Sequence, residues 1–286
     1  MIGREHVAGD TKGSIGVFED SWQDMRSATD SAAFGPLEAL LGEVKNEALA
    51  EILPPGPTKM LECGCGTAEV SAFFAMRGYR CTLLDASPAA LDLAQRRFDA
   101  LGCEAEFIQG NVYEMPVADD AFDVVSSFGL LEHFEDPNRV ISEMVRTIRP
   151  TGLLFADIVP KRFSVDTIGR GFNAIEHLAA GLIRGEPREG QHLARLSLRP
   201  SFYENDYTFE SYRGFFEQAG LVNIFGTGNR PFPLLMLPAA ASRVYAALLR
   251  RALPLWRQFD ASDARFTRWW GAGWWMWGSK PAHSAL

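Results

Sequence analysis

Short apolar runs and longer amphipathic stretches alternate along the middle of the chain. Apolar runs of four to seven residues are typical of buried strands, whereas apolar positions that recur every three or four residues are typical of helices. The runs predict strands at 60–63, 80–85, 105–109, 122–127 and 153–159, and the stretches between them predict helices near 67–77, 88–101 and 137–148. Strands that alternate with helices form a parallel sheet, with a ligand crevice at the carboxyl ends of the strands.

Two stretches, 160–207 and 229–270, interrupt this rhythm and read as helical inserts. Between them a helix over 208–219 leads into a strand over 221–226, and a last strand is expected at 274–280, antiparallel at or near the sheet edge. The pattern therefore predicts an α/β fold, with a Rossmann-like, doubly wound and mostly parallel sheet of seven strands, an antiparallel last strand and helical inserts.

The run Pro54-Pro-Gly-Pro57 marks a boundary, because proline and glycine end regular structure. Before it, apolar residues at helical spacing predict an N-terminal helical or lid region over 1–57. After it, residues 58–286 form the main domain, and we expect the two inserts to form a cap over the substrate.

The stretch Met60-Leu-Glu-Cys-Gly-Cys-Gly-Thr67 joins a buried strand to a helix through a tight turn. Gly64 and Gly66 flank Cys65 and let the backbone of the turn approach a ligand closely. The next strand ends in Asp85, nineteen residues after Gly66, where a carboxylate can accept two hydrogen bonds from a ribose diol. This arrangement predicts an adenosine-binding βαβ unit.

The charge around the turn distinguishes between adenosine cofactors. A dinucleotide site carries Gly-x-Gly-x-x-Gly and holds a pyrophosphate on a helix N-terminus. Here Glu69 stands at the third glycine position and Glu62 precedes the turn, so two carboxylates would repel a pyrophosphate. S-adenosylmethionine has a sulfonium, an ammonium and no phosphate, and it is the cofactor we predict; an NAD-dependent oxidoreductase is the disfavoured alternative.

Composition and charge indicate where the protein resides and which partners it can bind. The chain has 286 residues, 47% hydrophobic and 22% charged, and we see neither a signal peptide nor a membrane-spanning run, so we expect a cytoplasmic protein. Four cysteines fit neither a zinc site nor a disulfide scaffold, and we expect them to be reduced and mostly buried. Residues 1–159 hold 12 Lys and Arg against 26 Asp and Glu, whereas 160–200 hold 7 against 4 and 230–270 hold 7 against 2. This is no nucleic-acid-binding footprint; it favours a hydrophobic or anionic partner at the inserts.

A series of motifs between residues 58 and 160 resembles the class I S-adenosylmethionine-dependent methyltransferases, in the group of small-molecule and quinone methyltransferases. The matching stretches, in order, are Leu61-Glu-Cys-Gly-Cys-Gly-Thr67, Leu83-Leu-Asp-Ala-Ser87, Gly110-Asn111, Met115-Pro116, Ala121-Phe-Asp-Val-Val125, Leu130-Leu-Glu-His-Phe134 and Glu143-Met-Val-Arg-Thr-Ile-Arg-Pro-Thr-Gly152. The sequence departs from the methyltransferase motifs at three positions. Ala68 stands where the methyltransferase turn usually has its third glycine, Asn111 replaces the usual aspartate, and Thr151 replaces the first glycine of the usual Pro-Gly-Gly.

The resemblance implies a role for each cofactor-binding candidate. Gly64 and Gly66, with Cys65 between them, would lie against the methionine part, and Glu62 would hold its ammonium group. Asp85 would bind the ribose and Ala86 would pack on adenine. Asn111 and Val112 would meet the adenine edge, and Ser127 and Phe128 would lie under the cofactor near the sulfonium.

Transfer of a methyl group to a hydroxyl needs alignment, exclusion of water and a general base. His133, just after the fourth strand, is the first candidate for the base, and Asp157, near the end of the fifth, would orient it or act alone. The alternative is that His133 only caps or packs the strand–helix junction. Gly129 stands where ubiquinone-type enzymes have a further metal-binding carboxylate, so we expect no metal.

These observations predict a methyltransferase of a small molecule, with O-methylation favoured over N- or C-methylation. A protein that binds adenosylmethionine without transferring its methyl group is the alternative from another class. The helix over 239–253 has three interpretations: packing on the core, a lid over a hydrophobic substrate, or an interfacial helix of a peripheral-membrane enzyme acting on a quinone or lipid. The sequence favours packing over the membrane, and it indicates neither the acceptor nor the oligomeric state.

Overall fold

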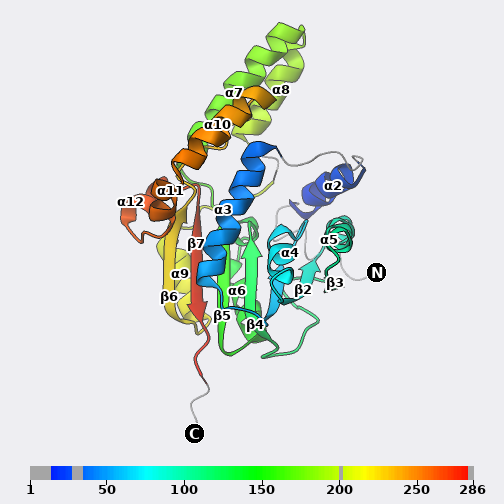
Figure 1. Cartoon of the computed structure of the whole chain (residues 1–286), viewed down its shortest axis with the longest axis vertical. Helices are drawn as coiled ribbons and strands as arrows, with labels where there is room; N and C mark the ends of the chain where they lie inside the picture. The colour runs from blue at the N-terminus through cyan, green and yellow to red at the C-terminus, as the bar shows by residue number, and fades with distance from the viewer. Residues whose placement is uncertain (1–13, 28–34, 200–201, 283–286) are drawn as a thin grey trace.

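The computed structural model describes residues 14–27, 35–199 and 202–282. Its centre is a seven-stranded sheet in the order β3-β2-β1-β4-β5-β7-β6, with helices on both faces (Figure 1). The strands span Lys59–Cys63 (β1), Arg80–Asp85 (β2), Ala105–Gln109 (β3), Phe122–Phe128 (β4), Ile148–Ile158 (β5), Val222–Asn229 (β6) and Gly273–Ser279 (β7). Strands β1 to β5 pair in parallel, and β7 runs antiparallel between β5 and β6. The predicted fold class is confirmed.

The helices follow the predicted rhythm through the first half of the chain. They are α2 (Ser14–Ser27), α3 (Pro36–Ile52), α4 (Glu69–Ala75), α5 (Pro88–Leu101), the 3-10 turn η1 (Leu131–His133) and α6 (Pro137–Thr147). Ser87 caps α5 by accepting the amide proton of Ala90 at 3.0 Å, and Pro88 lies in the first turn, as its fixed φ allows. These local signals explain why the sequence placed the boundaries of α5 well.

The second half contains α7 (Val165–Arg184), α8 (Pro187–Leu198), α9 (Phe209–Gln218), α10 (Ala239–Arg251), α11 (Leu253–Asp260) and α12 (Arg265–Trp270). Helices α7 and α8 form an antiparallel hairpin that projects from the body beyond the end of the sheet (Figure 1). Helix α10 ends at Arg251, and Pro254 lies in the first turn of α11, where proline is tolerated.

Alternate residues of the central strands pack into two hydrophobic cores, one on each face of the sheet. Met60, Phe155 and Trp275 pack with α3, α4 and α5, whereas their neighbours Leu61 and Met276 pack with α6 and α9. This is the consequence of the two-residue side-chain period of a strand that is buried on both faces. A third cluster joins α3 to α10 and α11 through Leu37, Leu40, Val44, Ala246, Leu249 and Trp256.

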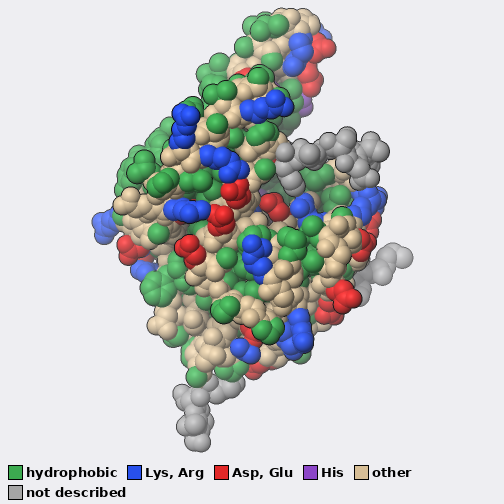
Figure 2. All heavy atoms as spheres, viewed as in Figure 1, with side chains coloured by type: hydrophobic (Ala, Val, Ile, Leu, Met, Phe, Trp, Pro, Cys, Tyr) green, Lys and Arg blue, Asp and Glu red, His purple; other side chains and the backbone are tan. Residues whose placement is uncertain are grey.

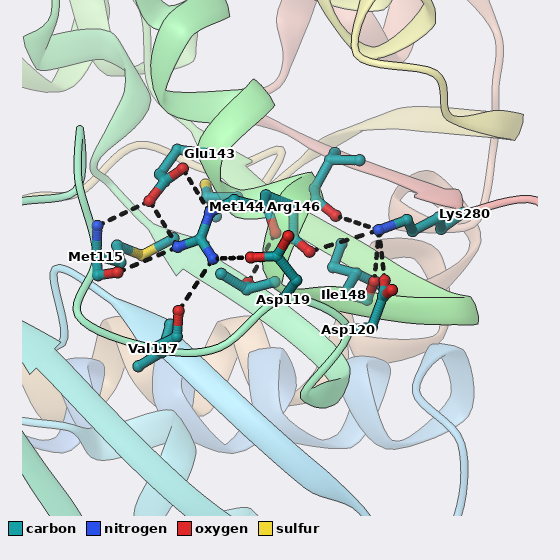
Figure 3. Close-up of polar contacts among 11 residues, drawn as sticks. Met115, Val117, Asp119, Asp120, Glu143, Met144, Arg146, Ile148 and Lys280 are labelled. Carbon is teal, nitrogen blue, oxygen red and sulfur yellow. Dashed lines mark hydrogen bonds and ion pairs between the residues drawn. The ribbon is translucent and has the colours of Figure 1, made fainter.

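Two cations fix the ends of α6 and the loop after β3 (Figure 3). Arg146 donates to both oxygens of Glu143 at 2.8 Å and to the carbonyl oxygens of Met115 and Val117 at 3.1 and 3.0 Å. Lys280, just after β7, donates to Asp120 and to the carbonyl oxygens of Val145, Arg146 and Ile148. The last carbonyls of a helix have no partner within it, and Lys280 supplies one. Together these contacts hold the loop after β3 at the edge of the crevice.

Candidate active site

The principal cavity opens at the carboxyl ends of β1, β2 and β4 and has a volume of about 280 Å³. This is the place where open α/β sheets bind ligands, because the strand order reverses between β1 and β4. Its walls come from the turns after these strands, from the loop after β3 and from α2 and α3.

The glycine-rich turn forms the floor of the cavity. Gly64 and Gly66 have φ of 66° and 51°, and the amides of Gly64 and Cys65 both donate to the carbonyl oxygen of Leu84 on β2. A Cβ on Gly64 would lie 2.7 Å from Leu130, so a side chain there would close the turn. Ala68 also has a positive φ, 51°, which strains an L-residue, so the third glycine of the family motif is replaced here at a cost to the backbone.

Asp85 is held in place by the turn that it faces. Its Oδ2 accepts the amide proton of Gly66 and its Oδ1 accepts that of Ser87, each at 2.9 Å. Burial raises the pKa of this carboxyl, and the two backbone hydrogen bonds lower it. Each oxygen retains a lone pair, and the side chain lines the cavity, so Asp85 can accept two hydroxyl protons from a diol.

Glu62 is 3% exposed and lines the cavity from β1. Ser71 donates to its Oε2 through both the amide, at 3.2 Å, and the hydroxyl. Burial raises the pKa of Glu62 to about 7, against the influence of Ser71 and of the nearby Lys45 cation. A ligand cation in the cavity would favour the ionised carboxylate.

Lys45, which we did not predict, is a cation in the cavity wall. It comes from α3, and its Nζ lies 5.4 Å from the centre of the Phe128 ring. The sequence does carry a signal for it: Lys45 stands in a half-buried stripe with Leu41, Ala48 and Ile52 at helical spacing, where a lysine is unexpected.

The remaining cofactor candidates divide into those that line the cavity and one that does not. Ala86, Val112, Phe128 and Asn111 line it. The Oδ1 of Asn111 already accepts the amide proton of Tyr113 at 3.0 Å, so one lone pair and the side-chain amide remain for a ligand. Ser127 lies in β4, fully buried, outside the cavity lining, and its Oγ has no hydrogen-bond partner among the described residues.

Helix α2 forms the roof. Phe18 and Trp22, one helical turn apart, both line the cavity, and a Cβ on Gly66 would lie 3.2 Å from the Trp22 ring. The pair therefore both packs on the glycine turn and covers it. The described lining of the cavity includes no residue from 160–270, so the substrate cap expected from the two inserts stays a prediction.

His133 lies in the cavity wall at the end of η1. Its Nδ1 is 2.7 Å from the carbonyl oxygen of Tyr203, and the rings of Phe18 and Phe202 lie 4.7 and 5.3 Å from its own. Burial lowers its pKa, so the imidazole stays neutral at neutral pH. A carbonyl oxygen can only accept, which places the proton on Nδ1 and leaves a lone pair on Nε2.

Asp157 and Glu132 lie beside the cavity without lining it. Asn229 donates to Asp157 at 2.9 Å, and burial raises the pKa of this carboxyl. Glu132 accepts the amide proton of Val159 at 3.2 Å, and burial raises its pKa to about 8. These contacts join the ends of β4, β5 and β6, and Asp157 as partner of His133 stays a prediction.

The residues fit S-adenosylmethionine better than a dinucleotide. The turn has no Cβ at the two positions nearest a ligand, and the carboxylates Glu62, Glu69 and Asp85 line the cavity with Lys45 as a cation. Glu69 occupies the first turn of α4, where a pyrophosphate would need to lie. Three carboxylates against one cation match a ligand with a sulfonium, an ammonium and one carboxylate.

The described residues also bear on metal binding, on the cysteine thiols and on membrane insertion. No three His, Cys, Asp or Glu side chains converge as metal ligands there. Cys63, Cys65 and Cys81 are buried and Cys103 is half-buried, all as free thiols. Of the helices that the structure describes, none is long and apolar enough to cross a membrane.

Comparison with known proteins agrees with this geometry. Residues 61–156 match the methyltransferase domain family. Ubiquinone biosynthesis O-methyltransferase from Pseudomonas putida (strain W619) is 31% identical over 150 residues, which cover 50% of this chain and 59% of that protein. Malonyl-[acyl-carrier protein] O-methyltransferase from Serratia marcescens is 31% identical over 96 residues, 34% of this chain and 36% of that protein. The chain thus matches about six tenths of the first relative's length and less of the second.

Among solved structures, the [4+2]-cyclase SpnF has the same fold, with a TM-score of 0.57, 16% identity and coverage of 96% of this chain and 97% of that chain. The matched segment contains the glycine turn, Asp85, Asn111 and His133. Its strands lie within the seven-stranded sheet. Residues 61–156 therefore belong to the methyltransferase domain family, and the sheet that contains them has the fold of the class I S-adenosylmethionine-dependent enzymes.

Proposed function

We propose that the protein transfers the methyl group of S-adenosylmethionine to a hydroxyl of a small molecule, with His133 as the general base. The observation that carries this proposal is the state of His133 in the cavity wall: neutral, with its proton fixed on Nδ1 and a lone pair on Nε2. A hydroxyl acceptor must lose a proton as its oxygen attacks, and a neutral imidazole takes it best. Both relatives above are named O-methyltransferases.

The residues of this chain bind and orient the two reactants. When bound, S-adenosylmethionine supplies an electrophilic methyl group. Asp85 would accept hydrogen bonds from the ribose hydroxyls, Glu62 would accept one from the ammonium group and Lys45 would donate one to the carboxylate. Phe18 and Trp22 exclude water from above. His133 Nε2 takes the hydroxyl proton, and the Tyr203 carbonyl stabilises the imidazolium through Nδ1–H.

Two classes of oxygen acceptor make different demands on His133. A phenol or alcohol carries a proton at neutral pH and needs a base, whereas a carboxylate is already ionised and needs none. The names of the relatives cover both classes, a ubiquinone precursor and a malonyl group. Because His133 is placed as a base, a phenol or an alcohol is the favoured acceptor. The aromatic side chains of Phe18 and Trp22 in the roof are consistent with a lipophilic acceptor.

The test combines binding and transfer. Titration calorimetry with S-adenosylmethionine, S-adenosylhomocysteine and NAD should show binding of the first two, lost in Asp85→Ala and retained in Asp99→Ala, which changes an exposed carboxylate on α5. Transfer of a labelled methyl group to a panel of phenols, carboxylates and amines should select phenols, and His133→Gln should slow it by about 10² to 10⁴. Binding of NAD alone would overturn the proposal, and transfer to carboxylates that survives His133→Gln would replace the acceptor class.

A protein that binds the cofactor without methyl transfer is the second candidate. It is favoured by the cyclase structure above, which has this fold over nearly the whole chain and is named for another reaction. Retained S-adenosylhomocysteine binding with no labelled product from any acceptor class would support it.

A further inference from the structure

Helix α7 exposes a continuous apolar stripe along the projecting hairpin. Ile168, Phe172, Ile175, Leu182 and Ile183 are 48%, 43%, 69%, 70% and 86% exposed. At 100° per residue these five positions fall on one face of the helix. Isolated exposed apolar residues are ordinary, but a stripe over four turns indicates an interaction surface.

The flanks of the stripe pack against other parts of the protein, so the stripe is the outward face of an ordered helix. On one flank, Gly181 of α7 meets Gly190 of α8 so closely that a Cβ would lie 2.7 Å from the Gly190 Cα. On the other flank, Asn173 donates to the carbonyl oxygen of Leu234 and accepts the amide proton of Met236. The hairpin is therefore ordered by its own contacts, and it leaves the stripe uncovered within the described residues.

Aromatic rings extend this surface onto the body of the protein. Phe163, just before α7, lies 6.0 Å from Trp269 of α12, and both are more than half exposed. Arg162 donates to the carbonyl oxygen of Trp269 at 2.6 Å and fixes the two segments together. We call Phe163, Ile168, Phe172, Ile175, Leu182, Ile183 and Trp269 the outer face. Figure 2 shows hydrophobic side chains gathered over the region where Figure 1 places α7, α10 and α12.

Four exposed arginines of the two inserts have no acidic partner among the described residues. Arg250 and Arg257 pair with Glu43 and Glu47 of α3 and hold α10 and α11 on the body. In contrast, Arg243 and Arg251 of α10, and Arg195 and Arg199 at the end of α8, are exposed and form no ion pair with the carboxylates that the structure describes. The two inserts carry a net positive charge on an otherwise acidic chain.

We propose that the outer face docks on the surface of an anionic lipid bilayer. Apolar and aromatic side chains enter the headgroup boundary, and the unpaired arginines contact lipid phosphates. The helices lie on the bilayer, since none of the described ones can cross it. This inference uses no residue of the cavity and does not depend on the proposed methyl transfer.

Charge and shape favour a bilayer over the other occupants. A second copy of the chain would bring two arginine-rich surfaces together, and like charges repel. An acidic protein would satisfy the charge, but the most exposed residues, Leu182 and Ile183, lie at the end of a projecting hairpin. Leu182 and Ile183 can enter a soft interface there while the exposed charged residues of the turn at 184–189 stay among the headgroups, whereas protein partners usually need a matching groove.

Flotation of the full chain with vesicles tests this proposal. The protein should float with vesicles of phosphatidylcholine and phosphatidylglycerol at 7:3, float weakly with phosphatidylcholine alone, and detach as salt rises. Ile175→Ser/Leu182→Ser should lower partitioning by about tenfold or more because apolar area is lost. Arg243→Gln/Arg251→Gln should lower it by roughly 25-fold, at about fivefold per arginine.

Matched controls separate this surface from general stickiness. Leu101→Ser and Arg96→Gln change exposed residues of α5, on the body of the protein, and should leave flotation unchanged. Each variant should keep its circular dichroism spectrum and its S-adenosylhomocysteine affinity. Flotation that is absent, or that falls equally in the controls, would overturn the proposal. So would a dimer in light scattering that is lost in Ile175→Ser/Leu182→Ser, or binding to an acidic protein without binding to vesicles.

Discussion

The Nδ1 atom of His133 donates a hydrogen bond to the carbonyl oxygen of Tyr203, 2.7 Å away and 70 residues further along the chain. This contact fixes the tautomer of the imidazole and turns the other nitrogen into the acceptor. Tyr203 is fixed in turn, because its amide donates to Ser14 Oγ at the start of α2 at 2.7 Å. The roof helix α2, His133 and the segment before α9 therefore form one connected unit.

A pH–rate profile should report this histidine. Burial lowers its pKa, so kcat/KM should stay high as pH falls through 6.5, the value of an unperturbed imidazole, and decline only below it, when Nε2 becomes protonated. His133→Gln should reduce kcat by about 10² to 10⁴ and remove the acid limb, with S-adenosylhomocysteine affinity unchanged. A purely structural histidine would instead give an unaltered profile in any variant that folds.

Lys45→Met should weaken binding of S-adenosylmethionine about tenfold, since one charge-assisted contact contributes about 1.5 kcal/mol or more. Adenosine has no carboxylate, and its affinity should not change. Calorimetry of both ligands measures the difference. Lys59→Met, an exposed lysine at the start of β1, is the matched control. Equal losses for both ligands would show that Lys45 supports the cavity without contacting the carboxylate.

Lys280→Met should lower the free energy of unfolding by about 1–3 kcal/mol. The ammonium group bonds Asp120 at 2.8 Å and three carbonyl oxygens at the end of α6, and Met removes all four of these contacts (Figure 3). Arg149→Met removes a more exposed ion pair with Asp123 and should cost less than about 1 kcal/mol. Urea unfolding of the two variants compares them, and a loss no larger for Lys280→Met would contradict this account.

Stability should fall as pH rises from 5 to 8. Burial raises the pKa of Glu132 and of Asp260 to about 8, so the folded protein keeps protons that the unfolded chain releases near pH 4. The folded state then binds more protons in this window, and the free energy of unfolding decreases with pH by an amount on the order of a few kcal/mol.

Glu132→Gln/Asp260→Asn should reduce that dependence, because neither amide titrates, and Glu62, whose pKa burial raises to about 7, should supply the slope that remains. Glu104→Gln, an exposed position before β3, should leave the dependence unchanged. Thermal melts between pH 5 and 8 measure the slopes, and a double variant with a slope as steep as that of the parent protein would assign the dependence to other groups.

Local signals carried much of the fold and of the cofactor site. The turn at Gly64 and Gly66, the carboxylate at Asp85 and the cap at Ser87 each lie within a single strand–turn–helix unit, where neighbouring residues dictate the backbone. Strand ends were less accurate: β5 begins at Ile148 and β6 extends to Asn229, beyond the apolar runs that predicted them. Pairing with β4 extends β5, and pairing with β7 extends β6. A local sequence pattern does not show which strands will pair, so it could not predict these extensions.

The sequence by itself determined the alternation of strands and helices, the cofactor turn and the acidic character of its surroundings. Only the tertiary structure decided that α2 roofs the cavity, that Lys45 enters it, and that Tyr203 fixes the tautomer of His133. It also separated the two faces of α10, one packed on α3 and one exposed beside unpaired arginines. The reason is physical: periodicity and turn chemistry act between residues a few positions apart, whereas each of these contacts joins segments that only chain folding brings together.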